Sequence, residues 1–175
     1  LHSHRNERLH DNLLICFFHA VFAQAARYAY ETYGLIPVFT AVEKHLDPVA
    51  HRQAAETLDI PHYFLDDAGG AGTIIGALAR MEAVVSMRLH ALIFAASQGV
   101  PLVGVVYDPK VSSFLKYMGQ ELFVDLGSVT AQSLCGMIDQ AVRQSGTPQS
   151  REEAVARLQE TEQRNVTVAR ELLGL

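Results

Sequence analysis

The sequence predicts an open, doubly wound α/β fold built on a mainly parallel sheet. Short runs rich in apolar and β-branched residues recur from residue 35 onward, and each is followed by a longer segment with helical patterning. The runs are apolar at consecutive positions rather than at every second one, which is typical of parallel strands covered by helices on both faces. A strand and a helix that repeat about every 20 residues therefore indicate this fold class.

Five strands are expected in chain order, at residues 35–40, 62–65, 83–87, 102–107 and 122–126. The segments between them are long enough for crossover helices, at about residues 46–58, 71–81, 88–98 and 110–119. Ahead of the first of these strands, the sequence permits a strand at 13–18 followed by a helix, or one helix over about 12–33. Gly34 ends the helix in both interpretations.

Composition limits the class of protein. The 175 residues are 49% hydrophobic, which suffices for a single domain over 1–175 with a sizeable core. The net charge of -5 argues against nucleic acid as a partner, because a phosphate backbone is bound by a basic surface. Cys16 and Cys135 are expected to be packing residues of a reduced, cytoplasmic protein. The polar opening 1–12 is expected to be a disordered or expression-derived end, and no metal site is assigned to its histidines.

One predicted strand end carries a group of polar side chains. Ser86, Arg88 and His90 lie where the strand at 83–87 gives way to the next helix. In a doubly wound sheet, ligands bind beyond the carboxyl ends of the strands, and the first-turn amides of a helix favour an anion there. A cation such as Arg88 opposes the helix dipole unless an anion lies between them. The pattern therefore predicts a bound phosphate or carboxylate.

The next strand end repeats this arrangement. Lys110 stands in the first turn of the helix that follows the strand at 102–107, and Asp108 precedes it as the expected N-cap. Asp47, which also precedes a proline, is expected to cap its own helix in the same way. Two adjacent strand ends that each present a cation predict an acidic small molecule as the ligand.

Structural roles for these side chains stay open at this point. Arg88 can pair with a carboxylate such as Glu82 or Asp125 instead of a ligand. His90 can be a hydrogen-bonded core histidine, and Lys110 can be an ordinary solvated side chain. Asp47 and Asp108 can be plain helix caps that take no part in catalysis.

The segment 86–119 has the sequence SMRLHALIFAASQGVPLVGVVYDPKVSSFLKYMG and closely resembles the signature of polysaccharide pyruvyl transferases, especially the CsaB type. The Ser-Met-Arg-Leu-His run, the Gly-Val-Pro and the Tyr-Asp-Pro-Lys-Val followed by Phe114 have the family's order and spacing. Residues 21–47 are similar, more loosely, to the family's helix, strand and loop that lead to an aspartate, here Asp47. For the arginine that the family usually carries after the first strand of this domain, the candidates are Arg5 and Arg8.

The resemblance implies a fold, a reaction and a set of partners. The family is similar to GT-B glycosyltransferases, with two Rossmann-like domains, and this chain would be the C-terminal one, inactive without its N-terminal partner domain. Members transfer the enolpyruvyl group of phosphoenolpyruvate, without a cofactor, onto a sugar, forming a pyruvate ketal and releasing phosphate. In the CsaB branch the acceptor is a bacterial cell-wall polysaccharide or its lipid-linked precursor at the inner face of the membrane, and the product anchors S-layer proteins.

Residue by residue, the resemblance makes Arg88 a donor-binding residue and His90 a catalytic one. The chemistry agrees, because a guanidinium can bind a carboxylate or phosphate through two hydrogen bonds and a histidine can supply a proton near neutral pH. Lys110 is a candidate for holding the departing phosphate. Three further residues near strand ends are candidates for the site: Ser86, Asp47 and Asp108.

Two other classes of function stay open on the sequence. One is a GT-B glycosyltransferase or sugar-nucleotide epimerase domain, in which the same helix N-terminus would hold a nucleotide diphosphate. The other is a non-catalytic ligand-binding domain that keeps the fold without the activity.

Overall fold

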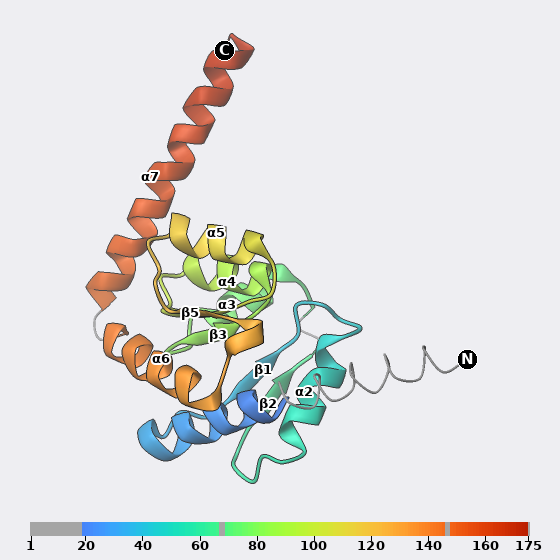
Figure 1. Cartoon of the computed structure of the whole chain (residues 1–175). Coiled ribbons are helices and arrows are strands. Elements are labelled where there is room, and N and C mark those ends of the chain that lie inside the picture. Colours follow the sequence, from blue (N-terminus) through green and yellow to red (C-terminus); the bar gives the residue numbers. More distant parts are fainter. Residues whose placement is uncertain (1–18, 67–68, 146–147, 175) are drawn as a thin grey trace. The chain divides into compact units, whose positions relative to one another are not determined.

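The computed structural model describes residues 19–66, 69–145 and 148–174 (Figure 1). Parallel strands alternate with helices from residue 35 on, which confirms the predicted fold class. Residues 19–33 are helical. The later elements are β1 (Val38–Thr40), α2 (Asp47–Ala55), β2 (Tyr63–Leu65), α3 (Ala71–Leu78), β3 (Val84–Ser86), α4 (Leu89–Ala96), β4 (Leu102–Val106), α5 (Pro109–Tyr117), β5 (Phe123–Asp125), a 3-10 turn (Leu126–Ser128), α6 (Ala131–Gln144) and α7 (Pro148–Leu173).

The strands form two parallel sheets, one of β1 and β2 and the other of β3, β4 and β5 in that order. The chain also divides into two compact units. Unit 1 comprises the residues up to Gly70 together with Ser128–Gly136, and unit 2 comprises Ala71–Gly127 and the residues from Met137 onward. The single domain expected over residues 1–175 stays a prediction.

The five strands and four connecting helices predicted from residue 35 onward are present, with ends shifted by a few residues. The largest shifts are of three residues: β1 begins at Val38 rather than at residue 35, α2 ends at Ala55 rather than at 58, and α3 ends at Leu78 rather than at 81. Pro37 has no N–H to donate to a strand ladder, although its carbonyl accepts a hydrogen bond from the Tyr63 amide at 3.0 Å. The strand at 13–18 and the alternative helix start near residue 12 lie outside the described residues.

Aromatic contacts hold the small sheet of unit 1 together. Phe39 of β1 is the register partner of Phe64 of β2, and their stacked rings have centroids 5.4 Å apart. The ring of His51 on α2 lies 5.5 Å from the Phe39 ring. Gly34, with a φ of +70°, ends the helix over residues 19–33 as predicted and allows the chain to turn toward β1. Cross-strand aromatic pairs of this kind stabilise a sheet of only two short strands.

The middle strand of unit 2, β4, is buried along its whole length. Because alternate side chains of a strand point to opposite faces, this burial requires that both faces be covered, as in a doubly wound sheet. Helix α5 approaches β4 closely: a carbon added at Gly104 would lie 2.3 Å from Cδ1 of Leu115, which is fully buried. The glycine thus allows the helix to pack directly on the strand backbone.

The last two helices differ in burial. Helix α6 buries one stripe of side chains, made of Leu134, Ile138 and Ala141, at the spacing of a helix face. In α7, by contrast, every described side chain from residue 162 to residue 174 is exposed. None of the helices in the described part of the chain combines the length and the apolar character needed to cross a membrane.

Candidate functional site

The turn between β3 and α4 brings together the first group of predicted site residues. Ser86 is the last residue of β3, and its hydroxyl oxygen accepts a hydrogen bond from the Arg88 amide at 3.0 Å. This local bond helps the chain leave the sheet and enter the helix. Arg88 is the N-cap residue of α4, with an extended backbone, and it makes no capping hydrogen bond because a guanidinium has no acceptor atom.

The first turn of α4 therefore keeps its amide donors available. Among the described residues, no side chain accepts a hydrogen bond from the amides of Leu89, His90 and Ala91. The first amides of a helix have no partner within the helix, and together with the dipole they form an anion-binding position. The Arg88 side chain starts at this same point of the chain. The β3–α4 turn thus combines a guanidinium with the positive end of a helix.

His90, the second residue of α4, is exposed, which excludes the core-histidine role. Its ring lies 6.4 Å from that of Phe94, one turn later on the same helix. The other side of α4 is buried through Ala91, Leu92, Ala95 and Ala96, and the small alanines allow the helix to lie close to its neighbours. Burial of that side leaves the imidazole in solvent beside the helix N-terminus, where it can exchange a proton with a bound molecule.

The β4–α5 turn holds the second group. Asp108 is the N-cap residue of α5, as predicted, and its Oδ1 accepts a hydrogen bond from the Lys110 amide at 2.9 Å. Nζ of Lys110 lies 3.6 Å from Oδ2 of Asp108 and 5.5 Å from the ring centroid of Tyr107. The neighbouring Tyr107 phenol, followed by the charge of Asp108, raises the pKa of Lys110. Lys110 is therefore a firmly protonated cation at this strand end.

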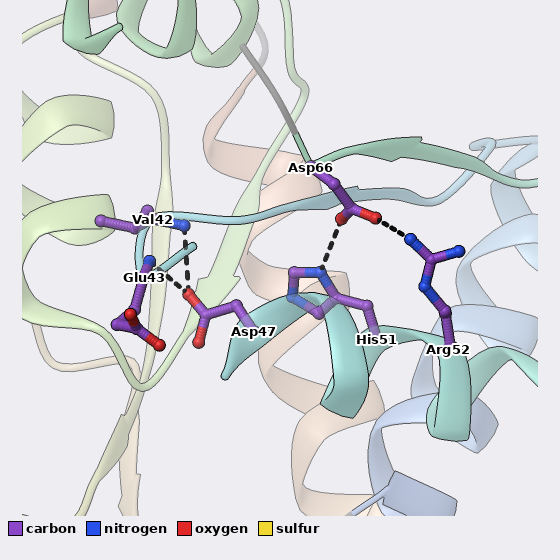
Figure 2. Close-up of polar contacts among 6 residues, drawn as sticks. All are labelled: Val42, Glu43, Asp47, His51, Arg52 and Asp66. Carbon is purple, nitrogen blue, oxygen red and sulfur yellow. Dashed lines mark hydrogen bonds and ion pairs between the residues drawn. The ribbon is translucent and has the colours of Figure 1, made fainter. Parts of the chain in front are cut away.

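The prediction that Asp47 caps α2 is wrong. Leu46 is the N-cap residue, and Asp47, only 7% exposed, turns its carboxylate back onto the loop that follows β1 (Figure 2). Its Oδ2 accepts hydrogen bonds from the amides of Val42 at 3.1 Å and Glu43 at 2.8 Å. The Glu43 carboxylate in turn accepts from the amides of His45 and Leu46. Two hydrogen bonds from loop amides stabilise a buried carboxylate more than the single hydrogen bond of a helix cap does. The amide donors of this loop are thus satisfied by side chains of the loop and of the start of α2.

A second cluster in unit 1 was not evident from the sequence. Asp66, directly after β2, lies between two consecutive residues of α2 (Figure 2): its Oδ2 is 2.9 Å from Nη2 of Arg52, and its Oδ1 is 3.6 Å from Nδ1 of His51. The Arg52 guanidinium also lies 5.8 Å from the Phe64 ring centroid. These contacts fasten α2 to the end of β2. The available signal was an aspartate placed directly after a predicted strand.

The structure brings some of the predicted site residues together and separates others. Ser86, Arg88 and His90 share one turn, and Lys110 follows the neighbouring parallel strand, so both groups lie at the carboxyl edge of the same sheet. Asp47 belongs to unit 1, where it holds a loop. Across residues 19–66, 69–145 and 148–174, no three histidine, cysteine, aspartate or glutamate side chains gather as a metal ion would require.

A comparison with known families bears on the functions considered. Residues 10–109, more than half of the chain, match the model of the polysaccharide pyruvyl transferase family. The chain belongs to this family. The match includes the β3–α4 turn and ends one residue before Lys110. No curated protein and no solved structure matches the chain.

Membership in the polysaccharide pyruvyl transferase family confirms the resemblance and places the chain in a family of transferases. The family name implies a polysaccharide acceptor. The match favours this function over a glycosyltransferase, an epimerase or a non-catalytic domain. The CsaB subtype and the position as a C-terminal half stay predictions.

Proposed function

We propose that the chain is the donor-binding domain of a CsaB-type pyruvyl transferase, which moves the enolpyruvyl group of phosphoenolpyruvate onto a sugar of a bacterial cell-wall polysaccharide. The family match supports the transferase class, and the chemistry of the β3–α4 turn supports an anionic donor. The donor is itself an activated enol phosphate, so the reaction uses no cofactor.

The observation that carries the proposal is the uncapped N-terminus of α4 with Arg88 at its N-cap position. Phosphoenolpyruvate has a carboxylate and a phosphate attached to the same carbon atom, the phosphate through its ester oxygen. Arg88 can take either group through two parallel hydrogen bonds, while the first-turn amides of α4 bind the same charge from the other side. A bound anion at this position interacts favourably with both the guanidinium and the helix dipole.

The proposed reaction joins two sugar hydroxyl groups to C2 of the donor and releases phosphate. His90, as an imidazolium, gives a proton to the enol CH2 group, which becomes the methyl group, and C2 gains oxocarbenium character. One hydroxyl oxygen bonds to C2, the bond from C2 to the phosphate oxygen breaks, and the second hydroxyl closes the ketal. Of the two hydroxyl protons, one restores the imidazolium and the other leaves with inorganic phosphate.

Further parts of the proposal concern groups beyond the β3–α4 turn. Lys110, at the neighbouring strand end, would hold the departing phosphate. The acceptor would bind to a second Rossmann-like domain that faces this one in a GT-B arrangement. A lipid-linked acceptor would place the reaction at the inner face of the membrane, and the product would anchor S-layer proteins.

A binding experiment tests the donor role directly. We would titrate the chain with phosphoenolpyruvate by calorimetry, beside Arg88→Ala and with UDP-N-acetylglucosamine as the competing ligand. Loss of a charged, two-point hydrogen bond is expected to weaken phosphoenolpyruvate binding by about ten- to hundredfold in Arg88→Ala. Arg143→Ala is the matched control, because Arg143 is an exposed arginine in the last turn of α6.

The two ligands distinguish two kinds of transferase. Phosphoenolpyruvate binding that depends on Arg88 and survives in Arg143→Ala supports pyruvyl transfer. Preference for the nucleotide sugar would instead support glycosyl transfer. Equal weakening of phosphoenolpyruvate binding in Arg88→Ala and Arg143→Ala would mean that the binding is nonspecific electrostatic attraction.

A further inference from the structure

The end of helix α7 leaves large apolar side chains in solvent. Four of them, between 44% and 82% exposed, lie close together in the sequence: Val166, Val168, Leu172 and Leu173. A single exposed apolar residue is normal for a protein surface, whereas a continuous series along one helix marks an interaction surface. The question is which partner this helix fits.

One line of positions along α7 has the spacing of a coiled-coil seam and contains no charged residue. Its steps alternate between three and four residues, as positions a and d of a heptad do, and its members are Leu158, Thr161, Asn165, Val168 and Leu172. The first two are half-buried and the last three are exposed. We refer to these five residues as the α7 seam.

The one hydroxyl group in the α7 seam is already satisfied. The Thr161 hydroxyl donates a hydrogen bond to the Arg157 carbonyl, one turn earlier in the same helix, at 2.9 Å. A second helix packed on the seam would therefore meet the Thr161 methyl group without burying an unpaired donor.

The charges beside the α7 seam are complementary to those of a second copy of the same helix. Arg157 has position g of the heptad and Glu162 has position e. In two parallel helices in register, position g of one helix lies beside position e of the other, five residues further along. Arg157 thus meets Glu162 of the second copy, and symmetry repeats the pair. Arg164, at the next g position, meets the uncharged Ala169, so no like charges oppose each other.

Asn165 favours the parallel orientation. In a parallel pair this residue lies opposite its own copy, and the two amide groups can hydrogen-bond to each other. In an antiparallel pair position a faces position d, so Asn165 would meet Val168 and bury an unpaired amide. A polar residue at one position a therefore selects orientation and register, although it lowers the stability of the pair.

We propose that α7 forms a parallel, two-stranded coiled coil with α7 of a second copy of this chain, through the α7 seam. The helix is already formed in the single chain, so association does not include the unfavourable nucleation of a helix. The inference is independent of the proposed function, because it uses no residue of the β3–α4 or β4–α5 turn.

Sedimentation equilibrium of the full chain, from low micromolar to submillimolar concentration, tests the proposal. The mass is expected to rise toward twice that of the monomer. Val168→Asp places two carboxylates opposite each other in the seam and is expected to weaken association at least about a hundredfold. Val166→Asp is the matched control, because Val166 has a similar exposure, 44% against 48%, but lies outside the seam. Its association constant should stay within about twofold of the parent chain's.

A charge exchange tests the flanking pair. Arg157→Glu turns two attractive contacts into repulsive ones and is expected to weaken association by about tenfold. Addition of Glu162→Arg to this variant restores the complementarity and should restore the parental association constant. Circular dichroism of each variant checks that the helices are retained.

Disulfide formation tests the orientation. In a chain whose two cysteines are replaced by serine, Leu172→Cys should form a disulfide between the two copies, because parallel helices place this position opposite itself. Gln163→Cys, on the outer side of the helix, should not.

Three results would overturn the proposal. A chain that stays monomeric at every concentration would show that the α7 seam does not bind a second copy. Equal weakening by Val168→Asp and Val166→Asp would locate the contact outside the seam. A dimer in which Leu172→Cys forms no disulfide would not be parallel.

Discussion

Two turns of this chain occupy the same place in the fold and treat their amide donors in opposite ways. The loop after β1 and the turn after β3 each follow a parallel strand and lead into a helix. In the first, the carboxylates of Asp47 and Glu43 accept hydrogen bonds from the loop amides. In the second, a guanidinium stands at the N-cap position, where a helix usually has an acceptor.

The difference shows how a repeated strand-helix unit separates stability from function. A turn that supplies its own anion gains stability and has no donors left for a ligand. A turn with a cation in place of the cap lacks that stability, but its amide donors remain available to a ligand. Such a departure from the usual capping preference is expected at a functional site. We therefore expect an anion to bind at the β3–α4 turn rather than at the loop after β1.

The largest expected effect concerns the group that follows the uncapped turn. His90→Ala is expected to lower the rate of ketal formation by about 10²–10⁴-fold, the usual contribution of a general acid, while phosphoenolpyruvate affinity changes little. The measurement is ketal formation with the complete acceptor system, together with donor binding to the same variant. His45, an exposed histidine of the loop after β1, provides the control in His45→Ala. Full activity of His90→Ala would show that the proton comes from another group.

A second substitution converts one kind of turn into the other. Arg88→Asp places a carboxylate at the N-cap of α4, as Asp108 already does for α5. Relative to Arg88→Ala, it is expected to raise the free energy of unfolding by about 1 kcal/mol, because the new acceptor satisfies a first-turn amide and favours the dipole. Both variants should lose phosphoenolpyruvate binding. Urea unfolding and calorimetry on the pair measure the two quantities.

Equal stability of Arg88→Asp and Arg88→Ala would contradict the comparison. It would mean that the first-turn amides of α4 already donate hydrogen bonds to an acceptor within the protein, as the amides of the loop after β1 do.

The elements from residue 35 onward were predictable because their signals are local. Apolar runs with flanking glycine and proline fix strands and helices, and a buried middle strand such as β4 has no polar face to obscure its apolar run. The division into two sheets was not predictable, because pairing between distant strands leaves no periodic trace in the sequence. β1 begins three residues later than predicted. Pro37 has no N–H for the hydrogen bonds of a strand ladder, and the apolar run alone does not show where that ladder begins.

The candidate site was predictable where a short segment holds it. Ser86, Arg88 and His90 lie within five positions, so a strand-to-helix turn suffices to bring them together. The role of Asp47 was not predictable, since its choice between capping a helix and binding loop amides depends on burial. Asp66 meets His51 and Arg52 only through the tertiary structure.

A third prediction concerns the turn that supplies its own acceptors. Asp47→Ala removes a buried acceptor from the amides of Val42 and Glu43 and is expected to lower the free energy of unfolding by about 2–3 kcal/mol. Asp47→Asn keeps one oxygen and should lose about half as much. Phosphoenolpyruvate affinity should stay within about twofold in both, measured beside the urea unfolding curves. Loss of donor binding without loss of stability would instead make Asp47 a ligand-binding residue.

The smallest effect is a pH dependence in unit 1, where ionisable groups serve stability. Burial lowers the pKa of His19 below its ordinary 6.5, with the nearby Glu56 raising it in part and the charge of His51 lowering it further. Below pH 6.5 the unfolded chain therefore binds more protons at this position than the folded one, so this contribution is present above pH 6.5 and is lost as the pH falls through that value. His19→Gln should flatten the fall in unfolding free energy between about pH 7.5 and about pH 5.5, and Glu56→Gln, which removes the raising influence, should steepen it. Unfolding curves at several pH values measure both slopes. Opposite changes in the two variants would confirm that burial at His19 outweighs its acidic neighbour, whereas a steeper fall in His19→Gln would reverse the sign.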